Sequence, residues 1–217
     1  MRHNDKDFDD LALTPELFDG QHQVIPIVSG GDDIIEEVNL PEVLPILTLR
    51  SSVIFPGSVT PITVGRAKSI ALVRAVEAGD KLLGAVLQVD GSVEDPQPND
   101  MHKVGTSARI LKVLEMPNGN LTVILAGLEK IEVGEYISTQ PYFKATITPT
   151  KDTTPDPKNV EFTALVDSIK EVALNIINIS PLMPKEAAFA IKNLDSSRAI
   201  INFICSNMDL TDDDRQQ

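Results

Sequence analysis

The apolar residues of this chain follow two different periods, one before and one after a proline-rich stretch at residues 149–158. Before it, short runs rich in β-branched residues indicate strands, whereas after it apolar residues recur at steps of three and four, as in amphipathic helices. The change of period predicts an α+β protein. We expect a β-rich domain at 41–150, a linker at 151–158 and a helical subdomain at 159–217.

The β-rich part is expected to hold about six strands and one helix, arranged as a curved sheet or open barrel. Pro56-Gly57 predicts a tight reversal, because proline fixes φ and glycine accepts positive φ. Asn118-Gly119 lies between two β-rich runs and predicts a hairpin. Helical spacing predicts the single helix at 66–78, with Gly79 as its C-terminal cap. Strands are expected near residues 46–49, 59–64, 82–89, 104–115, 121–133 and 142–149.

A long helix is expected to open the helical subdomain and to end near Ser180-Pro181. Pro184 suits the first turn of a second helix, and Asp195 is expected to cap a third. The run Thr211 to Asp214 resembles the start of a fourth helix, which leads us to expect that the natural protein continues past Gln217. The apolar stripe of the long helix comprises Phe162, Leu165, Val166, Ile169, Val172, Ala173, Ile176 and Ile177.

Charge is concentrated at the ends of the chain. Residues 1–40 hold ten acidic and two basic side chains, whereas residues 41–208 hold 18 acidic and 16 basic ones. The composition of 1–40 favours a disordered acidic arm, because it cannot bury enough apolar surface to offset its ordering entropy. In the alternative interpretation, residues 24–28 of this arm add a strand to the sheet or contact another subunit.

The sequence also bears on the cellular compartment. The first ten residues contain four Asp and no apolar run, so nothing resembles a secretory signal. No segment approaches the ~20 apolar residues of a membrane span. Cys205 is the only cysteine, which suits a reducing compartment. These features lead us to expect a cytoplasmic protein with no membrane partner.

Catalytic chemistry finds few candidates in this sequence. His102 lies in a polar loop, and a solvated residue is the preferred interpretation over an acid–base role. Cys205 has apolar neighbours, which favours an inert thiol over a nucleophile. The patterns GxxxxGK[ST] and GxGxxG do not occur, and no paired metal ligands have a recognisable spacing. We therefore expect no catalytic residue, no cofactor and no metal.

Nucleic-acid binding is not expected, because the basic residues are dispersed among acidic ones. Arg66, Lys68, Arg74 and Lys81 fall on or beside one predicted helix, where a solvated, salt-bridged face is the preferred interpretation. Protein recognition remains, through apolar residues near turns that either fold back into the core or form an exposed patch. The candidate contact residues are Val53, Ile54, Phe55, Met116, Pro117, Tyr142, Phe143, Leu182 and Met183.

The segment Leu44–Ile70, LPILTLRSSVIFPGSVTPITVGRAKSI, resembles the opening of the N-terminal domain of the ATP-dependent protease Lon. The Lon pattern has an LP-x-LPLR segment, then VVFPG, a strand and a GR-x-KSI helix start. Further matches follow in order at 93–100, 104–110, 116–119 and 140–143. Ser51-Ser52 departs from the more apolar or Asn/Asp-containing pair of that pattern. The acidic arm at 1–40 corresponds to a variable region of the family, so no function is carried over to it.

The resemblance implies a PUA-like β domain followed by helices, without the ATPase and protease portions of the parent protein. It implies a non-catalytic region that engages unfolded or damaged protein substrates and supports a hexamer, with a Ser–Lys dyad elsewhere in the parent. The first alternative is a stand-alone PUA-like RNA-binding module. The second is an architectural domain that oligomerises through the stripe at 162–177.

Overall fold

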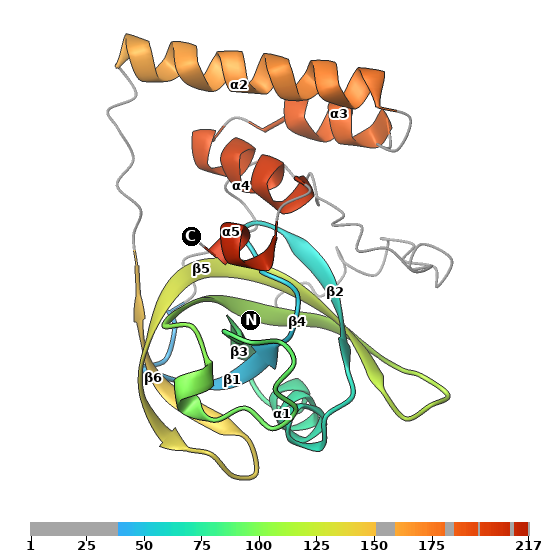
Figure 1. Cartoon of the computed structure of the whole chain (residues 1–217), viewed down its shortest axis with the longest axis vertical. Coiled ribbons are helices and arrows are strands. Elements are labelled where there is room, and N and C mark those ends of the chain that lie inside the picture. Colours follow the sequence, from blue (N-terminus) through green and yellow to red (C-terminus); the bar gives the residue numbers. More distant parts are fainter. Residues whose placement is uncertain (1–38, 151–158, 181–184, 195, 209–210, 217) are drawn as a thin grey trace, which may run out of the picture.

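A computed structural model describes residues 39–150, 159–180, 185–194, 196–208 and 211–216. The predictions for residues 1–38, for the linker at 151–158 and for Pro184 and Asp195 lie outside these ranges. The strands come first along the chain and most of the helices follow (Figure 1). The elements are β1 Val43–Leu49, β2 Val59–Val64, α1 Ala67–Glu77, β3 Leu82–Leu87, η2 Pro98–Asp100, β4 Val104–Glu115, β5 Leu121–Ser138, β6 Phe143–Pro149, α2 Val160–Ile179, α3 Lys185–Lys192, α4 Ser197–Asn207 and α5 Asp212–Gln216.

The six strands form one curved sheet in the order β2-β5-β4-β3-β1-β6. β1 and β3 are parallel, and the other neighbouring pairs are antiparallel. The long strand β5 also pairs with β6 through Ile131–Pro149 and Val133–Ile147, so the ring of pairings from β5 through β4, β3, β1 and β6 returns to β5. The predicted curved, six-stranded sheet is confirmed, and this additional pairing joins the end strand β6 to β5, the neighbour of the other end strand β2.

Two predicted turns position the strands. Gly57 has a φ of 79°, and the Ser58 N–H donates to the Phe55 carbonyl at 3.1 Å, which confirms the reversal at Pro56-Gly57. Gly119 has a φ of 82° between β4 and β5, which confirms the hairpin. The first reversal does not create a hairpin, because β1 pairs with β3 and β6 whereas β2 pairs with β5.

Both faces of the sheet bury apolar side chains. All six residues of β3 are buried, as its continuous apolar run requires. On one face, Leu83 packs in a cluster with Leu72 and Val73 of α1, and on the other face Val86 packs with Leu44 of β1 and residues of β6. The helix α1 thus covers one side of the sheet and is fixed there by fully buried side chains.

The end of α1 differs from the prediction. The C-terminal cap is Ala78, and Gly79 has no positive φ, so the assignment of Gly79 as cap is wrong. The left-handed conformation falls on Lys81 instead, with a φ of 62°. The N–H groups of Gly79 and Lys81 both donate to the Val76 carbonyl, at 3.0 and 3.1 Å. These bonds satisfy the end of the helix and place the left-handed residue just before β3.

The helices α2, α3 and α4 pack around a small core of their own, centred on Ile191 and Phe203. Asn159 caps α2 by accepting from the Phe162 N–H at 3.1 Å, and Ser180 ends it, as predicted. The N-cap of α4 is Ser196. Figure 1 places α2 and α3 farthest from α1, with α4 and α5 between them and the sheet.

Candidate substrate-contact site

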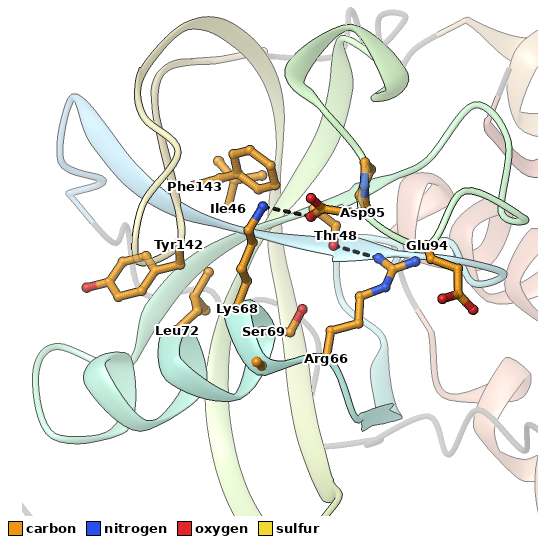
Figure 2. Close-up of a pocket in the computed structure, with 12 residues that line it drawn as sticks. Ile46, Thr48, Arg66, Lys68, Ser69, Leu72, Glu94, Asp95, Tyr142 and Phe143 are labelled. Carbon is orange, nitrogen blue, oxygen red and sulfur yellow. Dashed lines mark hydrogen bonds and ion pairs between the residues drawn. The ribbon is translucent and has the colours of Figure 1, made fainter.

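A pocket of about 320 Å³ lies where α1 begins, between β1, the loop at 90–97 and the start of β6 (Figure 2). We call it the α1 pocket. Its apolar wall is formed by Ile46, Leu72, Tyr142 and Phe143, and its polar groups are Thr48, Arg66, Lys68, Ser69, Glu94 and Asp95. Small-ligand pockets combine an apolar lining with a few placed polar groups in this way, and this volume is near the low end of their range.

The aromatic wall comes from the start of β6. Phe143 is 4 % exposed and packs edge-on against Tyr136, with ring centroids 5.7 Å apart and an interplanar angle of 80°. On its other side, the Lys68 ammonium lies 5.5 Å from the Phe143 ring centroid, within the range of a cation–π interaction. Tyr142 is half-buried and packs against the core cluster that contains α1. The two aromatic rings are therefore held from behind by the sheet.

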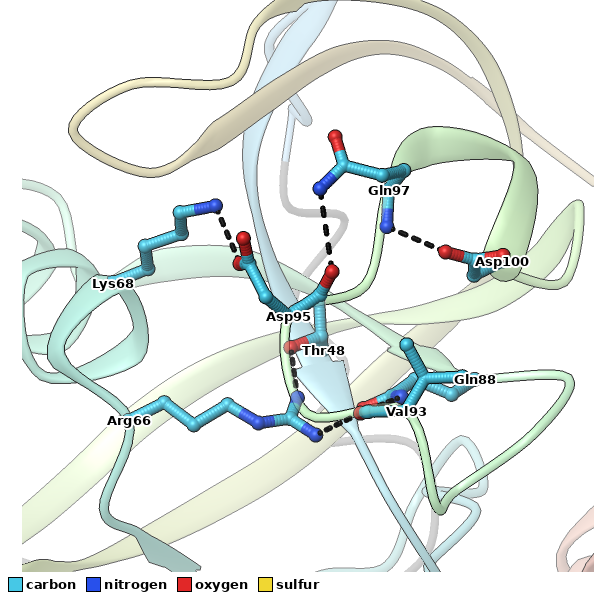
Figure 3. Close-up of polar contacts among 8 residues, drawn as sticks. All are labelled: Thr48, Arg66, Lys68, Gln88, Val93, Asp95, Gln97 and Asp100. Carbon is cyan, nitrogen blue, oxygen red and sulfur yellow. Dashed lines mark hydrogen bonds and ion pairs between the residues drawn. The ribbon is translucent and has the colours of Figure 1, made fainter.

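The Arg66 side chain ties the helix start to β1 and to the neighbouring loop (Figure 3). Its guanidinium donates to Thr48 Oγ1 at 3.1 Å and to the Val93 carbonyl at 3.1 Å. Burial, with a smaller contribution from Arg50, lowers the pKa of Arg66 from its ordinary value, while Glu94 and Asp95 oppose that shift. Because the ordinary pKa is so high, Arg66 keeps its charge at neutral pH.

The loop at 90–97 is held by a buried amide. Gln88 is 2 % exposed, and its Nε2 donates to the carbonyls of Asp90 and Val93 at 3.1 and 3.0 Å. The same Val93 carbonyl accepts from Arg66, so one acceptor joins the loop, the helix start and Gln88, the residue that follows β3. This network places Asp95 next to Lys68, with 2.7 Å between the carboxylate and the ammonium (Figure 3).

The predicted salt-bridged face of α1 is confirmed for two of its basic residues. Lys68 pairs with Asp95 at 2.7 Å, and Arg74 pairs with Glu115 at 3.0 Å. The second pair is exposed on both sides and contributes little to stability. The basic residues of this helix therefore carry acidic partners or, for Arg66, polar ones.

The nine candidate contact residues do not form one surface. Tyr142 and Phe143 lie in the α1 pocket. Met116 and Pro117 are exposed at the β4–β5 hairpin, with Met116 44 % exposed. Leu182 and Met183 belong to residues 181–184, outside the described ranges.

The segment of Val53, Ile54 and Phe55 lies elsewhere. Ile54 is 3 % exposed and packs in the core, and Val53 packs partly against it. All three line a second pocket of about 190 Å³ together with Asn202, whose Nδ2 donates to the Pro56 carbonyl at 3.0 Å. Any partner contact through Ile54 would require its side chain to leave the core.

The candidate residues predicted from the sequence include Tyr142 and Phe143 of the aromatic wall, but none of the polar residues that line the α1 pocket. Arg66, Lys68 and Ser69 belong to the GRAKSI segment, and Glu94 and Asp95 belong to the VEDP segment. Both segments carry the resemblance described above, and the fold brings them to one pocket. The available signal was that both segments match the Lon pattern although their polar residues have no evident structural role. That signal could have indicated a site at these residues.

A second apolar surface runs along α2. The side chains of Leu165, Ile169, Val172, Ile176 and Ile179, which we call the α2 stripe, are between 36 and 83 % exposed. Their spacing of four, three, four and three residues is that of a coiled-coil seam. The neighbouring face of α2 packs against α3 and α4 through Ile177, Ala173 and Leu174. The stripe is thus an apolar face that the described residues leave exposed.

Among the described residues, no group of three or more His, Cys, Asp or Glu side chains could hold a metal ion. Cys205 is half-buried, and burial raises the pKa of its thiol, which lowers the thiolate fraction available for nucleophilic attack. None of the described helices combines the length and the apolar character that crossing a membrane demands.

Tyr136 provides a pH-dependent test of the packing behind the pocket. Burial raises its pKa from 10.0 to about 12, and its buried hydroxyl has no hydrogen-bond partner among the described residues. The folded protein holds the Tyr136 proton more tightly than the unfolded chain does. The contribution of this difference to the stability of the fold is therefore complete below pH 10 and is lost as the pH rises through about 12. Absorbance titration of phenolate should show a high-pH step in the wild type that disappears in Tyr136→Phe.

The same variant should not lose stability, because it removes an unpaired hydroxyl and keeps the ring. Its free energy of unfolding at pH 7 is expected to equal or slightly exceed that of the wild type. A single phenolate step near pH 10 in the wild type would contradict the burial of this hydroxyl.

Comparisons with known proteins identify the family. The family model of the ATP-dependent protease La (LON) substrate-binding domain matches residues 43–217. The chain is 47 % identical to a Lon protease of Flavobacterium johnsoniae over 211 residues, which covers 96 % of this chain and 25 % of the relative. It is 37 % identical to a Lon protease of Cytophaga hutchinsonii, with 89 % and 24 % covered. The chain thus spans about a quarter of the length of these relatives.

A solved structure agrees with the fold. The N-terminal domain of the Mycobacterium avium complex Lon protease superposes with a TM-score of 0.64 at 20 % identity, covering 80 % of this chain and 88 % of that one. At this identity the match concerns the fold alone. The family model spans the α1 pocket, the sheet and the helices that follow, and the chain belongs to the family of Lon substrate-binding domains.

Proposed function

We propose that this chain recruits unfolded or damaged proteins to a Lon-like ATP-dependent protease in the cytoplasm, without catalysing a reaction itself. The α1 pocket carries this proposal, because its apolar wall and polar rim suit side chains that folded proteins keep inside. In the parent protein, other segments would supply ATP hydrolysis and a Ser–Lys protease. Weak contacts suffice there, since several linked copies raise the effective affinity.

Titration with a permanently unfolded model protein tests this function. We expect the 217-residue chain to bind the unfolded form, as measured by fluorescence anisotropy, and not to bind the native form of the same protein. Tyr142→Ala should weaken binding by about tenfold, since half-buried aromatic side chains dominate such contacts. Met116→Ala is the matched comparison, because this exposed side chain lies at the hairpin end, away from the pocket.

If only Met116→Ala weakens binding, the contact surface is the hairpin end rather than the α1 pocket. No binding of the unfolded protein by a chain with native circular dichroism would refute recruitment by this region. A gel shift at low salt examines the RNA-binding alternative. Tight, salt-dependent RNA binding would support it, although the acidic partners of Lys68 and Arg74 argue against a free basic surface.

We further propose that the α2 stripe supports assembly of the hexamer by packing against a second copy of the chain. The residues beside the seam include Ser168, Ala173 and Asn175, so few charges would be desolvated in such a contact. The α2 stripe lies in the helical part of the chain.

We also propose that the chain has two structural units. The β-rich unit comprises residues 41–150, and the helical unit comprises residues 159–217.

Ile169→Asp places a charge within the α2 stripe. If copies pair through it, the variant should dissociate at a concentration at least tenfold higher than the wild type, as measured by sedimentation equilibrium. Glu171→Gln changes an exposed residue of the same helix outside the stripe and should leave the mass unchanged. A wild type that stays monomeric, like the variant, argues against assembly through this face.

A further inference from the structure

The start of α1 presents backbone donors to the α1 pocket. Arg66 is the N-cap residue, but its side chain makes no capping hydrogen bond, and the first turn contains no acidic residue. The first intrahelical bond runs from the Ile70 N–H to the Arg66 carbonyl. The N–H groups of Ala67, Lys68 and Ser69 therefore have no partner within the helix, and all three residues line the pocket. Such donors, with the helix dipole, favour an anion.

The Ser69 side chain independently indicates a ligand. The residue as a whole is only 8 % exposed, and its hydroxyl has no hydrogen-bond partner among the described residues, but its oxygen is still reached by solvent. Figure 2 shows this hydroxyl directed into the space between Lys68 and Arg66. Because this hydroxyl faces the pocket and no protein group occupies it, an acceptor bound there can take its hydrogen bond in place of water.

Two cations border the same space. The Lys68 ammonium is held between the Phe143 ring and the Asp95 carboxylate, and Arg66 is anchored beside it. The Asp95 side chain is 71 % exposed and comes from a loop, so it can leave Lys68 at little cost. Asp95 thus acts as an acidic group of the chain itself that partly neutralises the site.

The apolar wall limits what kind of anion can enter. Leu72, Tyr142 and Phe143 adjoin the donors within a single pocket of about 320 Å³. A C-terminal apolar residue carries its carboxylate and its apolar side chain on the same Cα, so it could reach the donors and the apolar wall together. An internal Asp or Glu fits less well, because its apolar neighbours are on other Cα atoms and the peptide chain continues on both sides. Backbone donors are a known means of holding a peptide terminus.

We propose that the α1 pocket binds the C-terminal residue of a protein substrate, with the α-carboxylate at the Ser69 hydroxyl and the first amides of α1, and an apolar side chain against Tyr142 and Phe143. The incoming carboxylate displaces Asp95 from Lys68. This inference rests on the proposed recruitment of unfolded proteins, which it narrows to chains with an apolar C-terminal residue. Asp95 then competes with the substrate carboxylate for Lys68 and lowers the affinity of the pocket for the C-terminal residue.

The test compares three labelled peptides of one sequence that ends in Leu, titrated into the 217-residue chain. The first has a free C-terminal carboxylate, the second is amidated, and the third is amidated with an internal Asp. We expect the free acid to bind at least about tenfold more tightly than either amide, because a charge-assisted bond is lost in the amides. Its affinity should also decrease with added salt.

Variants assign the contact to this pocket. Ser69→Ala and Lys68→Met should each weaken binding of the free acid by about tenfold and leave the amide unaffected. Asp95→Asn should strengthen binding of the free acid by about threefold, a gain that mere damage to the fold cannot produce. Arg74→Gln is the matched control, because Arg74 forms an exposed ion pair on the same helix outside the pocket, and it should change nothing.

Equal binding of the free acid and the amides would overturn this inference. So would equal binding of the free acid and the peptide with the internal Asp, or weaker binding by Asp95→Asn. In each of these cases, continued binding of the unfolded model protein would leave the proposed recruitment standing. Loss of that binding as well would refute both.

Discussion

Replacing Gly127 with alanine is expected to lower the free energy of unfolding by about 3 kcal/mol, because the added methyl group has no space. A Cβ atom at this position would overlap the Phe55 carbonyl oxygen and approach Ile54 Cγ2 at 3.0 Å. The turn at 55–58 lies directly against this glycine: the Gly57 N–H donates to the Gly127 carbonyl at 2.9 Å, and the Gly127 N–H donates to the Ser58 carbonyl at 2.8 Å.

The loss should extend beyond the two hydrogen bonds. Moving the turn would displace Ile54, which is 3 % exposed and whose carbonyl accepts from the buried Thr106 hydroxyl at 2.6 Å. Urea denaturation followed by far-UV circular dichroism measures the effect. Gly79→Ala is the control, since a Cβ there meets only the carbonyl oxygens of Ala75 and Val76, at 3.5 and 3.7 Å. It should change the free energy by no more than about 0.5 kcal/mol, and equal losses in both variants would contradict the steric argument.

Local turn chemistry explains why much of the β-rich part could be predicted. Asn118-Gly119 and Pro56-Gly57 each specify a backbone conformation that few other residue pairs adopt, and the structure has both turns where they were expected. The buried strand predicted at 82–89 was likewise evident from its apolar run, and the structure ends it at Leu87. The predicted Gly79 cap failed because alternative hydrogen bonds to Val76 can end a helix without a left-handed glycine.

Features that depend on distant residues could not be predicted in this way. The pairing of β5 with β6 depends on how far β5 continues past Val133, and the sequence contains no sharp breaker there. The α1 pocket requires residues near positions 46, 68, 95 and 143 to meet, which the order of the sheet decides. Periodicity predicted an apolar stripe at 162–177 but could not say that its members Ala173 and Ile177 pack in the helical core while the neighbouring α2 stripe stays exposed.

The helical part has a small core, which makes it sensitive to a single deletion. Ile191 of α3 is fully buried, in a cluster whose other buried members are Ile177, Ala187, Ala190 and Phe203. Ile191→Ala is expected to destabilise this part by about 3 kcal/mol, from lost apolar burial and the cavity left behind. Since so few residues form this core, such a loss is a large fraction of its stability.

Two probes separate the two parts of the chain. Tyr136 and Tyr142 are the only tyrosines, the chain has no tryptophan, and both tyrosines lie with the strands. Most described helical residues belong to α2, α3 and α4. In Ile191→Ala, the helical signal at 222 nm should therefore fall at lower urea concentration than the tyrosine signal, which should keep its wild-type midpoint.

Phe189→Ala is the matched control, because Phe189 lies on the same helix but is 68 % exposed. It should change the free energy of unfolding obtained from either signal by no more than about 0.5 kcal/mol. Side-chain hydrogen bonds from Asn202 to the Pro56 carbonyl and from Gln216 to the Val104 carbonyl connect the two parts. If these contacts suffice to couple the parts, both signals of Ile191→Ala will fall together, and the division into units at 41–150 and 159–217 is wrong. Separate transitions would mean that the helical part can open while the α1 pocket stays intact.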